Sequence, residues 1–120
     1  MRLLVIDDSK ATRSSIKRIL STEDVVDFEC AEDALEHLKR DVRFDVVLVD
    51  WHMPNMSGID FIREVRKHAE YDEIRLVMVT SENSALSVVR ALQAGADEYI
   101  TKPFTRDGLL EKIEMLGFAE

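Results

Sequence analysis

Residues 47–58, VLVDWHMPNMSG, decide the fold of this chain. An apolar run over residues 46–49 ends at the carboxylate of Asp50, and a turn-forming stretch with Pro54 and Gly58 follows at once. This pattern is typical of a buried parallel strand that delivers one side chain to the carboxyl edge of a sheet. Folding alone does not require an acid at that place, so Asp50 is a candidate functional residue.

Four further apolar runs resemble this one in length, and helical patterns alternate with them. The five predicted strands cover residues 3–6, 25–28, 46–49, 76–79 and 99–101. Continuous rather than alternating apolar runs suit strands that are covered on both faces, as in a parallel sheet. The sequence therefore predicts one sheet of parallel strands buried between layers of helices.

The segments between the predicted strands carry apolar residues at helical spacing. Ser9 is a candidate N-cap of the first helix, and Gly95 is a candidate stop of the fourth. The predicted apolar faces contain Ile16, Ile19 and Leu20 in the first helix, Leu35 and Leu38 in the second, Ile59, Phe61, Ile62 and Val65 in the third, Leu86, Val89 and Leu92 in the fourth, and Leu109, Leu110, Ile113 and Leu116 in the fifth. Strand–helix alternation repeated five times predicts right-handed crossovers and a doubly wound α/β sandwich.

Length, charge and cysteine content narrow the function further. The 120 residues fit a single domain over residues 1–120, and the formal net charge is −8. This acidic balance argues against nucleic-acid binding, which requires clustered lysine and arginine. No apolar run is long enough to span a membrane. A single cysteine, Cys30, and an amino-terminal stretch without signal-peptide features predict a reducing, cytoplasmic location.

Charged and polar residues stand at the carboxyl ends of the predicted strands. Asp7 and Asp8 follow the first strand, Asp50 the third, Thr80 the fourth and Lys102 the fifth. In open α/β sheets ligands bind beyond these ends, where the strand order reverses. Carboxylates so close together repel one another, and a bound cation relieves this repulsion. Oxygen ligands from two strands together with water suit Mg²⁺ better than a closed Ca²⁺ cage.

These residues, taken in this order, resemble the signature of response-regulator receiver domains. The matching stretches are Asp7-Asp8, DWHMPNMSG from residue 50, Thr80, and KPFT at residues 102–105. Each motif alone is weak, since Asp8 by itself also fits a helix cap, but five motifs in order are specific. The resemblance extends from Leu3 to about Leu116 and is strongest to the single-domain chemotaxis regulators. It implies strand order 2-1-3-4-5 in a five-stranded, flavodoxin-like three-layer sandwich with five helices, of which chemotaxis regulators are a known example.

The resemblance implies that Asp50 accepts a phosphoryl group from the phosphohistidine of a sensor histidine kinase. A carboxylate is a competent nucleophile for this transfer and becomes an aspartyl phosphate. Mg²⁺, for which Mn²⁺ can substitute, would be held by Asp8, Asp50 and the backbone carbonyl of His52. Asp7 would complete this metal site, mainly through water or by placing the ion.

Further residues receive roles from the same resemblance. Lys102 and Thr80 would contact phosphoryl oxygens, and Tyr99 would be the aromatic switch residue that turns inward when Thr80 moves. His52 and Glu82 would tune the hydrolysis of the acyl phosphate. His52 stands where the nearest chemotaxis relatives carry Asn, so we hypothesise that it makes the phosphate lifetime depend on pH near neutrality. The alternative is a peripheral residue without a kinetic role.

The partner surface is expected on the fourth helix, the fifth strand and the fifth helix. Val88 is expected to face water because it lies away from the predicted apolar face of the fourth helix. Tyr99 and Lys112 match partner-contact positions of the chemotaxis family. A short helix or peptide would dock there, for example a segment of a flagellar switch protein.

The predicted function is a monomeric phospho-acceptor switch of a two-component system in chemotaxis. It is not an enzyme with a separate substrate, because it catalyses only its own phosphotransfer and autodephosphorylation. Alternatives are a relay intermediate that passes phosphate to a phosphotransfer domain, a phosphate sink, or the receiver of a DNA-binding regulator. A dehalogenase-like phosphatase would need a second acid where His52 stands, and a flavin binder would need a phosphate cradle where Asp7 and Asp8 lie.

Overall fold

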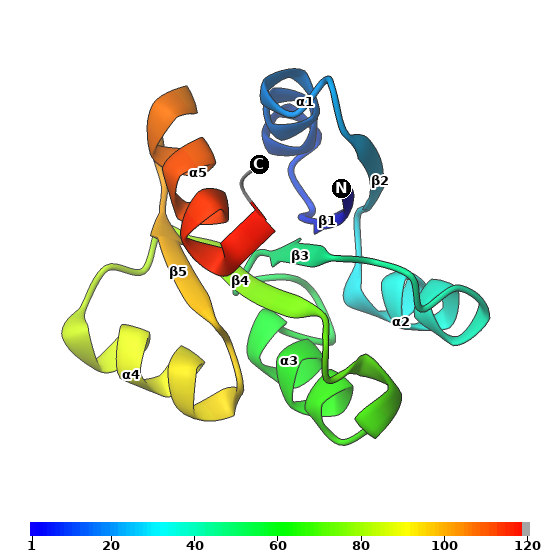
Figure 1. The fold of residues 1–120 in the computed structure, drawn as a ribbon. Coiled ribbons are helices and arrows are strands. Elements are labelled where there is room, and N and C mark those ends of the chain that lie inside the picture. Colours follow the sequence, from blue (N-terminus) through cyan, green and yellow to red (C-terminus); the bar gives the residue numbers. More distant parts are fainter. Residues whose placement is uncertain (119–120) are drawn as a thin grey trace.

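A computed structural model describes residues 1–118, and Figure 1 shows a central sheet with helices on both of its faces. The strands are β1 Arg2–Ile6, β2 Asp24–Phe28, β3 Val46–Val49, β4 Arg75–Thr80 and β5 Glu98–Thr101. The main helices are α1 Lys10–Ile19, α2 Ala31–Arg40, α3 Gly58–Arg66, α4 Ala85–Ala94 and α5 Arg106–Ile113, with short helical turns at Ala69–Tyr71 and Glu114–Phe118. The alternation predicted from the sequence is confirmed, and no predicted strand end is displaced by more than one residue.

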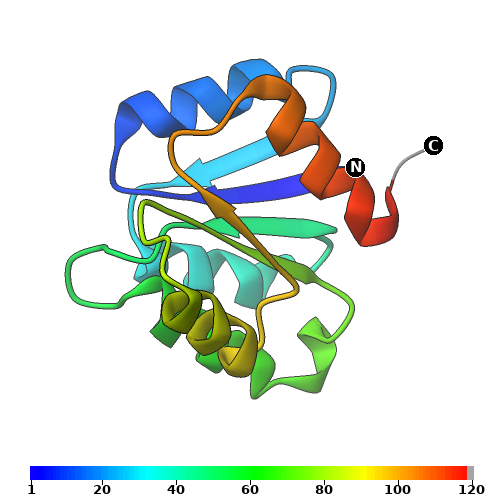
Figure 2. The same ribbon diagram turned by 90° about the vertical axis from the view of Figure 1, so that its left-hand side faces the viewer.

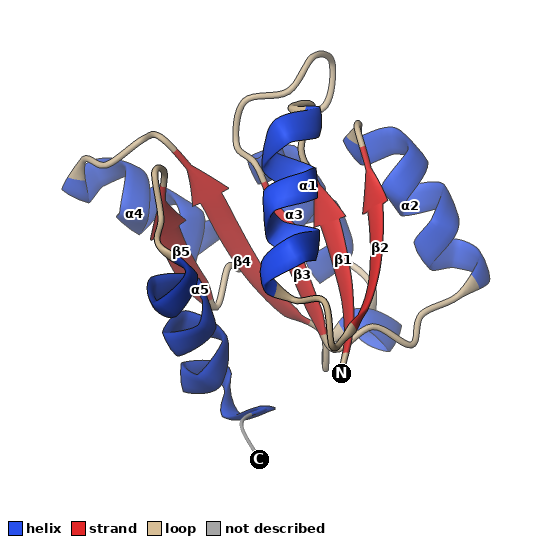
Figure 3. Cartoon of the chain, turned by 90° about the horizontal axis from the view of Figure 1, so that it is seen from above, coloured by secondary structure: helices blue, strands red, loops and turns tan. Residues whose placement is uncertain are grey.

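The strands form one parallel sheet in the order β2-β1-β3-β4-β5. Figure 3 shows all of them pointing in the same direction. β1 lies beside both β2 and β3, so the chain leaves β1 on one side of the sheet and returns on the other. The strand order therefore reverses between β1 and β3, which is where an open α/β sheet forms its ligand-binding crevice. The expected strand order is confirmed.

The two faces of the sheet pack against different helices. Figure 2 shows α1 and α5 on one face and α2, α3 and α4 on the other. Leu3 and Val5 pack in a core with α1 and α5. Leu4 and Ile6, which point the opposite way, pack in a second core with α2, α3 and α4. Because both faces are buried, the four positions of β1 from Leu3 to Ile6 are all apolar, which explains the continuous apolar runs.

The predicted boundaries of two helices are confirmed. The hydroxyl of Ser9 accepts a hydrogen bond from the Thr12 N–H at 3.2 Å and so caps α1. Gly95 ends α4 with a φ of 124°, a conformation that glycine adopts without the strain other residues incur. Within residues 1–118, no helix combines the length and the apolar character that crossing a bilayer requires.

The predicted apolar face of α4 is wrong. Leu86, Val89 and Leu92 point to solvent, with 69%, 46% and 47% of their surface exposed. The buried residues of this helix are Ser87 and Ala91. Large apolar residues at helical spacing normally mark the buried face, but here the small side chains lie against the core and allow the helix to approach it closely. The large residues are left as an exposed apolar stripe.

Candidate functional site

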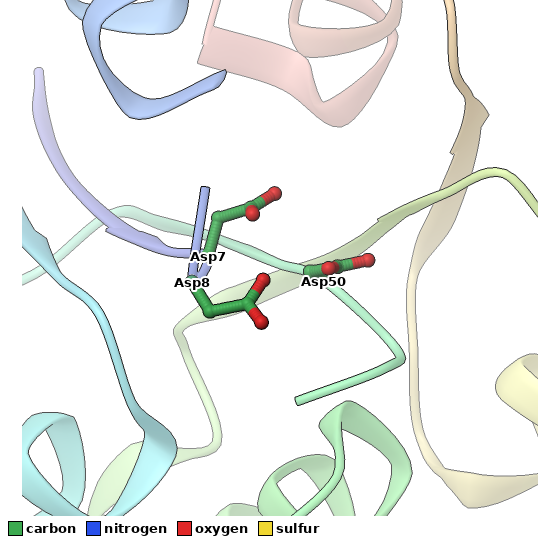
Figure 4. A group of neighbouring side chains, drawn as sticks. All are labelled: Asp7, Asp8 and Asp50. Carbon is green, nitrogen blue, oxygen red and sulfur yellow. The ribbon is translucent and has the colours of Figure 1, made fainter. Parts of the chain in front are cut away.

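Three carboxylates meet at the carboxyl ends of β1 and β3. Asp7 and Asp8 follow β1, Asp50 follows β3, and one oxygen from each lies within 4.8 Å of the others. Figure 4 shows that the three carboxylates extend to the same side of these strand ends. Asp7 and Asp50 are buried, whereas Asp8 is exposed. This acidic cluster (Asp7, Asp8 and Asp50) offers oxygen ligands and a solvent-facing side, which fits a hard divalent ion such as Mg²⁺ that keeps part of its water shell.

Protein groups hold Asp7 in place within the acidic cluster. Its Oδ1 accepts a hydrogen bond from the Ser9 N–H at 2.9 Å, and its Oδ2 accepts one from Lys102 Nζ at 2.8 Å. Its backbone carbonyl accepts a hydrogen bond from Arg13 Nη1 at 2.7 Å. Because both carboxylate oxygens already have donors, Asp7 is suited to positioning an ion rather than to coordinating it alone. Arg13 was not predicted, since one basic residue on a helix gives no sequence signal for this contact.

Lys102 brings a positive charge from β5 into the acidic cluster. Its Nζ lies 2.8 Å from Asp7 Oδ2 and 3.6 Å from Asp50 Oδ1. The peptide bond between Lys102 and Pro103 is cis. As expected from the sequence, Lys102, which follows β5, reaches Asp7 after β1 and Asp50 after β3.

The pKa of the Asp50 carboxyl is raised above its usual value. Burial is the main cause because it disfavours the charged form, and the negative charges of Asp7 and Asp8 add to it. The Lys102 ammonium and a hydrogen bond from the Trp51 backbone N–H act in the opposite direction. A cation in the acidic cluster would further favour the ionised carboxylate, which is the nucleophilic form.

Gly58 allows the loop after Asp50 to fold back closely on β3. A Cβ atom at this position would lie 2.2 Å from the backbone oxygen of Asp50, so no larger residue fits without a shift of the backbone. The Gly58 N–H also donates a hydrogen bond to the Trp51 carbonyl at 2.8 Å. The sequence had marked Gly58 only as a turn residue, and its role in placing Asp50 follows from packing between segments.

Thr80 and Tyr99 are both connected to the backbone of Glu82. The Oγ1 of Thr80, which is fully buried, accepts a hydrogen bond from the Glu82 N–H at 3.3 Å. The hydroxyl of Tyr99, whose ring is 7% exposed, donates a hydrogen bond to the Glu82 carbonyl at 2.7 Å. The two residues expected to act as a switch are therefore linked through one peptide segment, and Tyr99 already lies inward.

His52 and Glu82 lie together, as their positions after β3 and β4 had suggested. His52 Nε2 and Glu82 Oε2 are 3.0 Å apart, and both side chains are substantially exposed. The His52 ring also stacks on Trp51, with ring centroids 6.0 Å apart. The direct hydrogen bond was not predicted, because sequence spacing alone does not fix the approach of two loops.

The predicted partner surface is brought together only in part. Tyr99 and Lys112 line one depression of about 350 Å³ beside β5 and α5, and Lys112 Nζ lies 3.2 Å from Glu98 Oε1. The expectation that Val88 faces water is wrong, because it is half-buried and packs against the core. The exposed apolar residues of α4 are instead those of the stripe, Leu86, Val89 and Leu92.

Comparisons with known proteins agree with this geometry. The family model of the response regulator receiver domain matches residues 3–114. The chemotaxis protein CheY1 of Helicobacter pylori is 41% identical, and the alignment covers 97% of this chain and 96% of that protein. Chemotaxis protein CheY4 of Vibrio cholerae has a similar structure, with a TM-score of 0.89 and 28% identity over 96% of this chain and 97% of that one.

A BeF3-activated DrrB receiver domain is also similar in structure, with a TM-score of 0.86 and 28% identity over 98% of this chain and 97% of that one. The match to the family model and the identity to CheY1 extend over nearly all of the sequence. The observed strand order and the acidic cluster are also those that the resemblance to receiver domains had implied. This chain belongs to the response-regulator receiver-domain family.

Proposed function

We propose that this chain is a phospho-acceptor switch in which Asp50 receives a phosphoryl group from the phosphohistidine of a sensor histidine kinase. The arrangement of Asp50 beside Asp8 and Lys102 carries this proposal. It combines a nucleophilic carboxylate, oxygen ligands for a divalent ion, and an ammonium 3.6 Å from the nucleophile. Phosphoryl transfer depends mainly on such positioning and charge neutralisation.

In the proposed transfer, a carboxylate oxygen of Asp50 forms a bond to phosphorus while the bond between phosphorus and the histidine nitrogen breaks. The imidazole of the donor keeps the electron pair of that bond and takes up a proton. Lys102, which contacts Asp7 and Asp50 in the structure, would turn to a phosphoryl oxygen and balance its charge. Mg²⁺, when bound by Asp8, Asp50 and the backbone carbonyl of His52, supplies further neutralisation of the phosphoryl charge.

The phosphoryl group would change the protein through Thr80 and Tyr99. Charge-assisted hydrogen bonds from Thr80 and Lys102 would contribute roughly 1.5–3 kcal/mol each. Moving a two-state equilibrium from 1:99 to 99:1 takes about 5.5 kcal/mol. Two contacts therefore supply most of the switch with little excess, so the response is partial until a partner binds.

The acyl phosphate must also be removed for the signal to end. Water would attack the phosphorus atom and release phosphate, and the hydrogen-bonded side chains of His52 and Glu82 would tune this hydrolysis. The protein thus catalyses its own phosphotransfer and autodephosphorylation and acts on no separate substrate.

Chemotaxis is the proposed setting, because the most similar proteins include chemotaxis regulators over their full length. The proposed partners are the kinase and a flagellar switch protein, the latter docking on Tyr99, Lys112 and the exposed stripe of α4. The chain would act in the cytoplasm as a single, monomeric receiver domain that binds neither nucleic acid nor membrane. A relay intermediate, a phosphate sink and the receiver of a DNA-binding regulator share the same phospho-acceptor site.

Partner capture tests the proposal and separates these alternatives. Parent protein and Asp50→Asn are incubated with Mg²⁺ and beryllofluoride, a phosphoryl analogue, and tested for binding to a flagellar switch peptide. The proposed function predicts stronger capture of the parent with the analogue and no such gain for Asp50→Asn. Transfer of phosphate from the labelled parent to a histidine phosphotransfer domain, without any peptide binding, would support the relay and contradict the motor switch.

A further inference from the structure

Arg90 makes an unusual contact for a surface cation of an acidic protein. It is the only charged residue of α4, and its guanidinium carbon lies 5.4 Å from the centroid of the Trp51 ring. None of the ion pairs formed within residues 1–118 involves Arg90. An arginine over an indole face is attracted by the ring quadrupole. The Arg90 side chain therefore contacts Trp51, the residue that follows Asp50.

Trp51 is well placed to transmit a change at Asp50. It directly follows Asp50 in the chain, and its carbonyl accepts the hydrogen bond from the Gly58 N–H at 2.8 Å. The Trp51 residue is 7% exposed. A backbone held by this hydrogen bond and a buried ring leave little freedom, so a displacement at Asp50 would also displace the surface that Arg90 contacts.

Arg90 also lies next to the exposed stripe of α4. Leu86 precedes Arg90 by four residues, so the two side chains are neighbours on one side of the helix, and Val89 directly precedes Arg90 in the chain. A contact that fixes Arg90 against Trp51 therefore fixes the rotation and position of the stripe relative to the acidic cluster. No other charged group of α4 can do this, because Arg90 is its only one.

We propose that Arg90 is a positioning residue that couples α4 to Asp50 through its contact with Trp51. The proposal rests on the phospho-acceptor function proposed above. The contact is present in the arrangement in which Tyr99 lies inward, with its hydroxyl on the Glu82 carbonyl. If the phosphoryl group favours that arrangement, the contact and the phosphoryl group stabilise the same state. By linkage, each then strengthens the other to the same extent.

The first measurement examines the contact in the free protein. Trp51 is the only tryptophan, so its emission reports this site without labels. Arg90→Met keeps the length of the side chain but removes the charge, and Arg90→Lys restores a cation. Arg63→Met, at an exposed arginine of α3, is the matched control. Acrylamide quenching of Trp51 should increase in Arg90→Met, return toward the parent value in Arg90→Lys, and stay unchanged in the control.

The second measurement examines the coupling. Beryllofluoride affinity in the presence of Mg²⁺ is measured by thermal shift, so that variants without tryptophan can be included. A contact of this kind predicts a loss of affinity of about two- to fivefold in Arg90→Met, a smaller loss in Arg90→Lys and none in Arg63→Met. In a Trp51→Met background, Arg90→Met should cause no further loss, which a general structural role of Arg90 would not predict.

The outcomes separate this inference from the function on which it rests. A parent protein that does not bind beryllofluoride would refute the phospho-acceptor function itself. A parent that binds it, with equal affinity in Arg90→Met, would refute the coupling and leave the function standing. The same loss on Arg90→Met with and without Trp51 would also refute it, because the effect would not pass through the indole.

Discussion

His52 and Glu82, which are 30 positions apart in the sequence, are joined by a hydrogen bond of 3.0 Å between Nε2 and Oε2. The bond connects the loops that follow β3 and β4, beside Asp50 and Thr80. In the proposed function, this pair would lie beside a phosphoryl group on Asp50. The two side chains that we propose tune the lifetime of the signal are therefore in direct contact with each other.

His52→Asn should shorten the lifetime of the phosphorylated protein. Asparagine is too short to keep the contact with Glu82, and the loss of one hydrogen bond, at ~0.5–1.5 kcal/mol, corresponds to roughly a two- to tenfold faster hydrolysis. Phosphate release is measured for both proteins from about pH 5.5 to 8.5, which also tests the hypothesis that His52 makes the phosphate lifetime depend on pH. Equal rates for both proteins at every pH would contradict the role of His52.

Asp50→Asn should stabilise the protein when no divalent ion is bound. The pKa of Asp50 is raised in the folded state, mainly by burial and by Asp7, so the native state binds more protons than the unfolded state above the usual carboxyl range. The stability of the parent therefore falls as pH rises from the usual carboxyl pKa through the raised pKa of Asp50, and the full cost is present above that raised pKa. Removing the charge removes this cost. Urea unfolding in EDTA at neutral pH should give a larger free energy of unfolding for Asp50→Asn.

Mg²⁺ should reverse this ranking. An ion that binds only the native state adds ~2.7 kcal/mol when its concentration is 100 times its dissociation constant. The parent should gain this stability, whereas Asp50→Asn, which lacks one carboxylate ligand, should gain less. An equal gain for both proteins would place the ion away from Asp50.

The position of the acidic cluster could be predicted from the sequence, whereas its internal contacts could not. A parallel sheet brings all strand ends to one edge, so Asp7, Asp50 and Lys102 could be placed together from the order of the elements alone. The contact of Arg13 with the Asp7 carbonyl and the bond between His52 and Glu82 depend on how helices and loops approach one another. That approach is set by packing over the whole chain, and no local pattern records it.

Gly58→Ala should disturb the loop after Asp50. The added Cβ would lie 2.2 Å from the Asp50 backbone oxygen, and the backbone must shift to admit it. We expect a loss of about 1–3 kcal/mol in the free energy of unfolding, as for other over-packed sites, together with weaker Mg²⁺ binding. Gly108→Ala, where the nearest contact is the Thr105 hydroxyl at 3.0 Å, is the control. If the two variants were equally stable, Gly58 would not be needed for close approach.

Polar substitutions on the exposed stripe of α4 should leave stability unchanged. Leu86→Gln and Leu92→Gln replace side chains that are 69% and 47% exposed, so unfolding free energies should stay within about 0.5 kcal/mol of the parent. Ala91→Gln, at a fully buried position, should destabilise by several times that amount. Capture of the flagellar switch peptide should fall in the stripe variants. A large loss of stability in Leu86→Gln would contradict the observed orientation of α4 and support the buried face that the sequence had suggested.

The orientation of α4 could not be predicted because two faces of this helix have residues at a spacing that suits burial. Leu86, Val89 and Leu92 have the spacing of a buried face, and hydrophobicity alone favours them. Ser87 and Ala91 form the face that is buried, since a helix with small residues can lie close against the core. Ser84 stabilises this choice locally, because its hydroxyl caps the helix and lies 2.9 Å from that of Ser87.

Labelling by acetyl phosphate tests the central claim most directly. The parent and Asp50→Asn are incubated with acetyl phosphate, with Mg²⁺ or with EDTA, and the bound phosphoryl group is measured by intact-mass spectrometry and mapped by peptide analysis. The proposed function predicts one phosphoryl group on Asp50 of the parent, lost on treatment with hydroxylamine and absent in EDTA and in Asp50→Asn. Equal labelling of Asp50→Asn, or no labelling of the parent with Mg²⁺, would contradict it.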